Sequence, residues 1–296
     1  MSKAAPTDID PDSVADILRA AAAEEILPRF KSLKSHEISE KNPGDLVTVA
    51  DRASEAFLSR ELAALIPGAL IVGEEAHEED TSALGRLNDA EWAWIIDPID
   101  GTHNFAHGTA RFAVIVALLR RGETVMGWIH DPNAAVDAVA QAGAGTLIAG
   151  SRAILPPTPK ISDMVGSLAP RRADSLRARQ TAPDAPPLPC DFRRYRCVGL
   201  EYIDLARGEL NFARYAGKLM PWDHAAGVLM YREAGGHDGM TADGRAYAPS
   251  ASQPVRLPPR PQLAPEPQSA APAEIGAQRR RELESRRELD HDGTTD

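Results

Sequence analysis

The sequence predicts an α/β (α+β) fold, in which helical and strand-like patterns alternate over most of the chain. Apolar residues recur at helical spacing in two N-terminal stretches, 12–28 and 52–66. Short apolar runs bounded by turn residues follow at 69–72 and 92–96, as expected for buried strands. This mixture favours helices packed on a sheet over an all-helical or all-strand protein.

The first helix has candidate caps at Asp12 and Ser13, whose side chains can accept hydrogen bonds from a helix N-terminus. We expect this helix to end near Pro28 or to run on to about Ser35. A polar stretch follows, and 45–49 is expected to be a short extended piece.

The second helix, 52–66, presents Leu58, Leu62 and Leu65 on one face, so that face should pack inward. It ends at the Pro-Gly pair of 67–68, which stops a helix.

Three strand-like runs then follow closely, at 112–119, 124–130 and 135–140. Turn residues separate them at 121–122 and 132–133. This spacing predicts an antiparallel meander.

The remaining expected elements are short. The strand-like runs are 164–168, 193–197 and 211–215. The helical stretches are 173–180, 200–206 and one from about 222 to 235.

The composition excludes some classes of protein. The net charge is −10, with 43 acidic and 33 basic residues, which argues against nucleic acid as a partner. The two cysteines, Cys190 and Cys197, cannot form a disulfide framework or a zinc cluster. No apolar run is long enough to span a membrane, and the N-terminus lacks a signal-peptide pattern, so we expect a cytoplasmic protein without a membrane partner.

Two carboxylates stand at the end of the second buried run. The stretch 94–102 reads WIIDPIDGT and brings Asp97 and Asp100 close together in the chain. Its proline fixes the chain direction and its glycine allows a tight turn, and sites are commonly built at strand ends. Taken alone, the same stretch is as well explained by a solvated turn.

Further carboxylates lie at the ends of other expected elements. Glu74 and Glu75 follow a short apolar strand, Asp45 and Asp51 flank another run, and Asp223 begins the last helix. Each alone has an ordinary explanation, such as a surface position or a helix cap. Together they offer hard oxygen ligands, which select Mg²⁺ or Mn²⁺ over zinc.

These segments together resemble the inositol monophosphatase family, whose motifs occur here in the family's order. They are 45–51 (DLVTVAD), 71–75 (IVGEE), 94–105 (WIIDPIDGTHNF) and 222–227 (WDHAAG). The resemblance covers roughly residues 12–250. It implies a layered αβαβα sandwich of the sugar phosphatase type, often a homodimer.

The resemblance also implies a division of the chain and an activity. We expect an N-terminal α+β metal-binding half at 1–150 and a C-terminal α/β half at 151–250. The activity would be lithium-sensitive hydrolysis of a small soluble phosphate monoester of the inositol, sugar or polyol type. It would require two or three Mg²⁺ ions, or Mn²⁺ in their place.

The residues expected at the site are carried over by position from the same motifs. The expected metal ligands are Glu74, Asp97, the carbonyl of Ile99, Asp100 and Asp223. The expected catalytic residues are Glu74 and the pair Asp51 and Thr102, which orients the nucleophilic water. The expected substrate contacts are Asp100, Gly101, Thr102, Gly199 and Glu201.

Departures from the family pattern leave the substrate open. Leu200 and Glu201 stand where small residues contact inositol phosphate, and Ala216 replaces an acidic residue, with Lys218 nearby. Histidinol phosphate and a phosphoadenosine nucleotide stay possible substrates. A different reading is a protein that keeps the fold and acts by binding a macromolecular partner.

The segment 251–296 differs in character from the rest. It is rich in proline and arginine and poor in large apolar residues, so we expect a disordered tail. Either a shifted reading frame in a GC-rich gene or natural divergence would account for this change.

Overall fold

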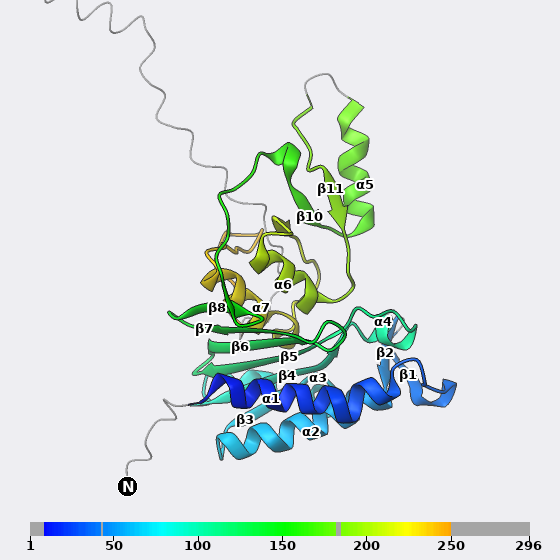
Figure 1. Ribbon diagram of the computed structural model, residues 1–296, viewed down its shortest axis with the longest axis vertical. Helices are drawn as coiled ribbons and strands as arrows, with labels where there is room; N and C mark the ends of the chain where they lie inside the picture. The colour runs from blue at the N-terminus through cyan, green and yellow to red at the C-terminus, as the bar shows by residue number, and fades with distance from the viewer. Residues whose placement is uncertain (1–8, 43, 182–184, 250–296) are drawn as a thin grey trace, which may run out of the picture. The chain divides into compact units, whose positions relative to one another are not determined.

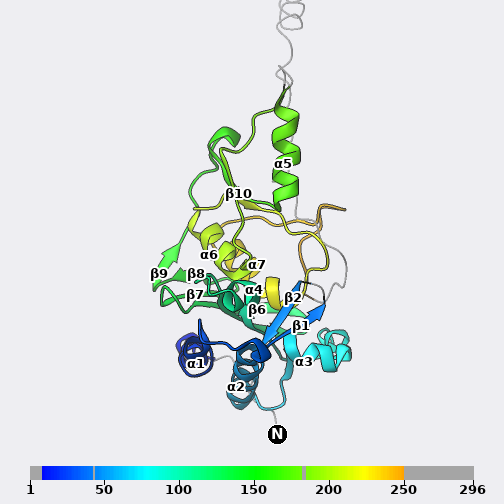
Figure 2. The same cartoon turned by 90° about the vertical axis from the view of Figure 1, so that its right-hand side faces the viewer.

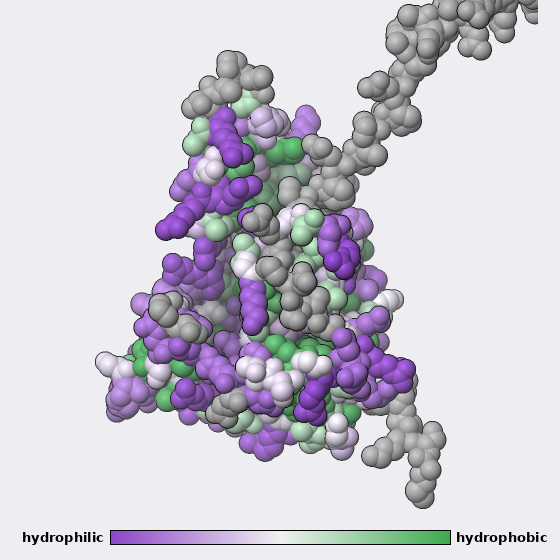
Figure 3. All heavy atoms as spheres, turned by 180° about the vertical axis from the view of Figure 1, so that it is seen from behind, coloured by the Kyte–Doolittle hydropathy of each residue, from purple (hydrophilic) through white to green (hydrophobic). Residues whose placement is uncertain are grey.

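The structure, a computed structural model, describes residues 9–42, 44–181 and 185–249. These residues belong to one compact unit of the chain. The tail expected at 251–296 lies outside them. Figure 3 shows one face of the molecule, on which polar side chains dominate and apolar ones form small patches. In the described part of the chain, no helix is long and apolar enough to cross a membrane.

A seven-stranded sheet forms the centre of the fold, in the order β3-β4-β5-β6-β7-β8-β9. Its strands are β3 (Leu70–Gly73), β4 (Ala93–Asp100), β5 (Ala113–Arg120), β6 (Glu123–Asp131), β7 (Val136–Gln141), β8 (Gly145–Ile148) and β9 (Ser151–Ala153). β3 pairs with β4 in parallel, and every later pair is antiparallel. The expected meander is confirmed, and β8 and β9 extend it beyond the expectation.

Two helices, α1 (Pro11–Ala21) and α2 (Val49–Leu65), cover one face of this sheet (Figure 1). Successive side chains of a strand point to opposite faces of the sheet, so β4 contributes apolar side chains to two hydrophobic cores, one on each face. Trp94 and Ile96 pack with the first two helices. Ala93 and Ile95 pack on the other face.

The other face is covered by α6 (Val198–Arg207) and α7 (Pro221–Glu233). Beyond these helices lies a three-stranded sheet in the order β11-β10-β12, with a further helix beside it (Figure 2). These elements are β10 (Val165–Ser167), α5 (Pro170–Ala178), β11 (Asp191–Arg193) and β12 (Phe212–Ala213). The alternating layers confirm the expected αβαβα arrangement.

Short elements connect these layers. A hairpin of β1 (Ile38–Asn42) and β2 (Asp45–Thr48) precedes α2, while α3 (Glu74–Glu79) and α4 (Thr102–Ala106) follow β3 and β4. A turn of π-helix spans Ala22–Ile26. Turns of 3-10 helix span Leu27–Arg29, Ser35–Glu37, Thr81–Arg86, Ile161–Asp163 and Arg179–Thr181. The large sheet ends at β9, near the expected boundary at residue 150, and the division into halves stays a prediction.

Two local expectations are wrong. The first helix is capped by Asp10, whose carboxylate accepts from Asp12 N–H, because Pro11 is well suited to the first helical position. The strand expected at 193–197 ends at Arg193 instead. Arg196 has a φ of 54°, in the left-handed region, and this conformation breaks an extended strand just before α6.

Candidate active site

Strand pairing and helix starts bring the predicted carboxylates to one end of the large sheet. β3 and β4 run in parallel, so Glu74 after β3 lies at the same edge as Asp97 and Asp100 in the last residues of β4. Asp51 lies in the first turn of α2, and Asp223 lies in the first turn of α7. We call Glu74, Asp97, Asp100 and Asp223 the carboxylate cluster.

The electrostatics show that members of this cluster share one region of space. Burial raises the pKa of Asp97 well above its ordinary value, and the charges of Glu74, Asp100 and Asp223 raise it further. Burial raises the pKa of Asp223 in the same way, with further increases from Glu74 and Asp100. Each ionised carboxylate therefore disfavours ionisation of its neighbours.

One lysine reaches this acidic region from β1. Lys41 Nζ lies 2.7 Å from Glu75, 3.3 Å from Glu74 and 3.6 Å from Glu78, and its side chain is 4% exposed. Burial opposes its charge, but the three glutamates together raise the pKa of Lys41. Burial still raises the pKa of Glu74 to about 8, against the opposing effect of Lys41. The positive charge of Lys41 therefore does not balance the negative charges of the surrounding carboxylates.

Asp97 also carries an oxygen without a protein partner. Its Oδ1 is buried and accepts no hydrogen bond from the described residues. Burying a carboxylate without compensation is costly, and a divalent cation that prefers oxygen ligands would compensate it. Among the described residues, no three His, Cys, Asp or Glu side chains already form a metal-coordinating group. The fit to a cation therefore rests on charge and on this oxygen.

Asp51 and Thr102 form the hydrogen-bonded pair that the motifs predicted. Thr102 Oγ1 lies 2.9 Å from Asp51 Oδ1 and 2.9 Å from the carbonyl oxygen of Ile99. Thr48 donates to the other carboxylate oxygen of Asp51 from its N–H and its hydroxyl, at 2.8 and 2.6 Å. Burial raises the pKa of Asp51 to about 6. Asp51 thus caps α2 with one oxygen and meets Thr102 with the other.

The segment 195–201 closes over the turn that carries Asp100. Gly199 N–H donates to Asp100 Oδ2 at 2.5 Å, and Cys197 Sγ–H donates to the same oxygen at 3.1 Å. Burial raises the pKa of Asp100, while the Gly199 N–H opposes that rise. Gly101 has a φ of 93°, and a Cβ there would lie 2.9 Å from the carbonyl oxygen of Arg111, so the close approach requires glycine.

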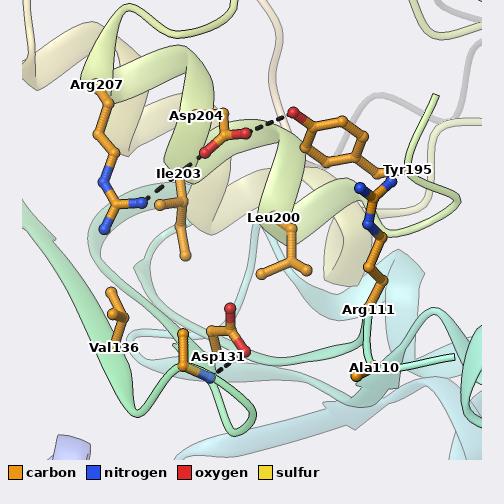
Figure 4. Close-up of a pocket in the computed structure, with 10 residues that line it drawn as sticks. Ala110, Arg111, Asp131, Val136, Tyr195, Leu200, Ile203, Asp204 and Arg207 are labelled. Carbon is orange, nitrogen blue, oxygen red and sulfur yellow. Dashed lines mark hydrogen bonds and ion pairs between the residues drawn. The ribbon is translucent and has the colours of Figure 1, made fainter. Parts of the chain in front are cut away.

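Glu201 and Leu200 have partners outside the carboxylate cluster. Glu201 is 4% exposed, and its carboxylate accepts the Tyr195 N–H at 3.1 Å. Leu200 points into a separate cavity of about 250 Å³ beside α6, near Tyr195 and Asp204 (Figure 4). No member of the carboxylate cluster lines that cavity. Glu201 is therefore placed to hold the segment 195–201 in position.

The comparison with known families agrees with this geometry. The sequence profile described as "Inositol monophosphatase family" matches residues 10–273 of the 296-residue chain. The chain belongs to the inositol monophosphatase family. The resemblance drawn from the motifs is thereby confirmed.

Individual family members show how close the likeness is. A Vibrio cholerae protein named Nus factor SuhB is 32% identical over 227 residues, which span 74% of this chain and 81% of that protein. A Rhizobium meliloti inositol-1-monophosphatase is 30% identical over 222 residues, 73% of this chain and 79% of that protein. A solved Thermotoga maritima IMPase structure has a TM-score of 0.68 at 24% identity, covering 83% of this chain and 90% of that one. This last likeness shows the fold alone.

Several residues around this inositol monophosphatase-like site were not foreseen from the sequence. Lys41 comes from a hairpin that the Pro-Gly pair at 43–44 could have indicated. Asn104 lies in the motif 94–105, and its side-chain amide donates to the carbonyl oxygens of Arg111 and Tyr195, both at 2.8 Å. Cys197 and Arg196 gave no local signal, because long-range contacts place them.

Proposed function

We propose that this protein is a metal-dependent phosphatase that hydrolyses a small soluble phosphate monoester. The observation that carries the proposal is the buried carboxylate cluster, whose members raise one another's pKa and include the unpartnered Asp97 Oδ1. Glu74, Asp97, the Ile99 carbonyl, Asp100 and Asp223 would hold two or three Mg²⁺ ions, or Mn²⁺. Bound divalent cations supply positive charge to the phosphoryl oxygens and lower the pKa of a bound water.

The chain's own residues would orient the attack. The Thr102 hydroxyl lies between Asp51 and Ile99, so its oxygen can accept a hydrogen bond from the nucleophilic water while its proton bonds Asp51. The water oxygen would then bond phosphorus as the ester P–O bond breaks, and of the two protons of the water one would end on the leaving oxygen, giving an alcohol, and the other on inorganic phosphate. Phosphoryl transfer depends mainly on such in-line placement and on charge neutralisation.

The proposed substrate contacts lie on the turn after β4. Asp100, Gly101 and Thr102 would contact the ester, and Gly199 lies against Asp100. Helix α4 has only five residues, so its dipole adds little to phosphate binding. Glu201 was expected among these contacts; its Oε1 accepts the Tyr195 N–H, so we propose that it supports the segment 195–201 beside the ester.

The alternative is a protein that keeps the fold and acts by binding a macromolecular partner. The name of the Vibrio relative, a Nus factor, favours this alternative. The retained carboxylate cluster favours the phosphatase, since partner binding does not require buried, mutually repelling carboxylates. The net charge of −10 supports our proposal of no nucleic-acid partner. We also propose that the protein is a homodimer in the cytoplasm.

A phosphate-release assay on a substrate panel separates the two functions. The panel contains inositol 1-phosphate, glycerol 2-phosphate, histidinol phosphate, adenosine 2′-phosphate and 3-phosphoglycerate, which carries a second anionic group, each with Mg²⁺ or with a chelator. We expect release from at least one compound with Mg²⁺, loss of release in chelator, and inhibition by Li⁺. Release from none of them with Mg²⁺ or Mn²⁺ would contradict the proposal and favour the partner-binding alternative.

A further inference from the structure

Arg196 is fixed by its backbone against the turn that carries Asp100 and Thr102. Its carbonyl oxygen accepts Asn104 Nδ2–H at 3.2 Å, and a Cβ on Gly101 would lie 3.1 Å from that oxygen. The next residue, Cys197, donates to Asp100. The backbone of Arg196, from which its side chain extends, is therefore held in place by the same contacts that join the segment 195–201 to the turn.

The backbone of Arg196 adopts a conformation that non-glycine residues rarely use. Its φ is 54°, and the left-handed region costs an L-residue about 1–2 kcal/mol. Such outliers persist where the surrounding structure fixes them, and they concentrate at ligand sites. Lys31, Arg121, Ala135 and Ala149 also have a positive φ, so the conformation alone assigns no role to the side chain; it fixes the direction in which the Arg196 side chain leaves the backbone.

The Arg196 guanidinium lies on His103, the residue after Thr102. Nη1 is 3.0 Å from His103 Nε2 and 3.2 Å from Nδ1. Burial, with Arg196 and His107, lowers the pKa of His103. An imidazole carries no negative charge in either protonation state, so this contact leaves the charge of Arg196 uncompensated.

Several exposed arginines form carboxylate ion pairs that Arg196 lacks. Arg120 pairs with Glu91, Arg193 with Asp191 and Arg232 with Asp238. Over residues 9–42, 44–181 and 185–249, Arg196 forms no ion pair with a carboxylate. A guanidinium has five N–H donors, and contact with one imidazole leaves most of them available.

We propose that Arg196, supported by His103, determines specificity by binding a second anionic group of the substrate, a phosphate or a carboxylate. The scissile phosphate would lie at the carboxylate cluster, while the second group would lie one residue along the turn, at His103. Arginine recognises both kinds of group through paired hydrogen bonds. This inference rests on the proposed phosphatase function and narrows its substrate class to bis-anionic phosphomonoesters.

The test uses substrates that share a three-carbon skeleton: glycerol 3-phosphate, 3-phosphoglycerate and propane-1,3-diol bisphosphate. The variants are Arg196→Gly and Arg196→Gln, and Arg193→Gln is the matched control. Glycine keeps the left-handed backbone without strain, so its effect reports the lost guanidinium and not a shifted loop.

With Mg²⁺, the wild type should hydrolyse both bis-anionic compounds with kcat/KM at least about tenfold above that for glycerol 3-phosphate. Both Arg196 variants should remove this preference, mainly through KM, because the lost contact is present in the ground state as well. Arg193→Gln should retain it. The two compounds with a second anion separate phosphate from carboxylate recognition. An unchanged preference in Arg196→Gly would overturn the inference, as would an equal loss with glycerol 3-phosphate.

A binding measurement separates this inference from the phosphatase proposal. Propane-1,3-diylbisphosphonate and propylphosphonate are not hydrolysed, and calorimetry with Mg²⁺ compares their affinities without any turnover. The inference predicts tighter binding of the bisphosphonate to the wild type and equal binding to Arg196→Gly. Equal binding to the wild type overturns the inference whatever the phosphatase assay gives. Absence of phosphate release alone contradicts only the catalytic proposal.

Discussion

The carboxylate cluster and the segment 195–201 meet at one turn, but different forces hold them there. The cluster lies at the ends of regular elements, where apolar strands and helix starts fix each acid. The start of the segment is irregular, and the segment is held by hydrogen bonds with residues distant in sequence: Gly199 N–H donates to Asp100, and the Asn104 side-chain amide donates to the carbonyl oxygen of Tyr195. In our proposals the cluster on the scaffold performs the chemistry, whereas the segment 195–201 determines selectivity.

The largest expected effect is the loss of a cluster acid. Asp97→Asn or Asp223→Asn should lower turnover by at least about a hundredfold, because each removes charge from the proposed metal site and keeps its shape. Asp89→Asn, at an exposed position, is the matched control and should keep the wild-type rate. Phosphate release and circular dichroism on the same samples provide the measurement. Wild-type rates in Asp97→Asn would mean that the cluster is not catalytic.

The next effect concerns Thr102, whose hydroxyl bonds Asp51 and would orient the nucleophilic water. Thr102→Ala should reduce turnover by about ten- to a hundredfold with little change in metal affinity, since its proposed role is to aim the water. Loss of the bond to Asp51 as a purely structural contact would instead cost about 1 kcal/mol of stability and leave the rate intact. Turnover and melting temperature, measured together, distinguish these results.

A smaller effect is expected from substitution of Glu201, which lies in the segment 195–201. Glu201→Ala leaves the Tyr195 N–H without its acceptor and should cost about 1–3 kcal/mol of stability, with a several-fold drop in rate as the segment loosens. Glu201→Gln keeps an acceptor oxygen and should retain most of both. Equal damage by the two variants to kcat/KM, with unchanged stability, would show that the negative charge contacts substrate directly.

The sequence predicted the two sides of this comparison unequally. Apolar runs that end in Glu74 and in Asp97–Asp100 are local patterns, so these two strands could be foreseen, and the family motifs supplied the residues of the cluster. The meander from 112 to 140 was equally regular. The positive φ of Arg196, the Cys197 bond to Asp100 and the burial of Glu201 arise from long-range contacts, which no local pattern encodes.

A last effect, on stability and not on turnover, is the pH dependence of unfolding in the absence of divalent cations. The pKa values of Glu74, about 8, and Asp51, about 6, lie above ordinary values, so the folded protein binds more protons than the unfolded chain between pH 4 and 8. Their stabilising contribution is therefore complete below about pH 4 and is lost as pH rises through 6 and then 8. We expect the melting temperature in chelator to fall over this range and Mg²⁺ to restore it at alkaline pH. Glu74→Gln should flatten the upper part of the curve, and a rise in stability with pH in chelator would contradict this account.

Cation binding by the carboxylate cluster is the central claim, and Mn²⁺ electron paramagnetic resonance tests it without reference to any substrate. Bound Mn²⁺ loses the sharp six-line signal of the free ion, so titration of the protein gives the number of bound ions and their affinity. The account predicts at least one bound Mn²⁺ per chain in the wild type and in Asp89→Asn, competition by Mg²⁺, and affinity weakened by at least about tenfold in Asp97→Asn. An undiminished free-ion signal with the wild type, or equal binding by Asp97→Asn, would contradict it.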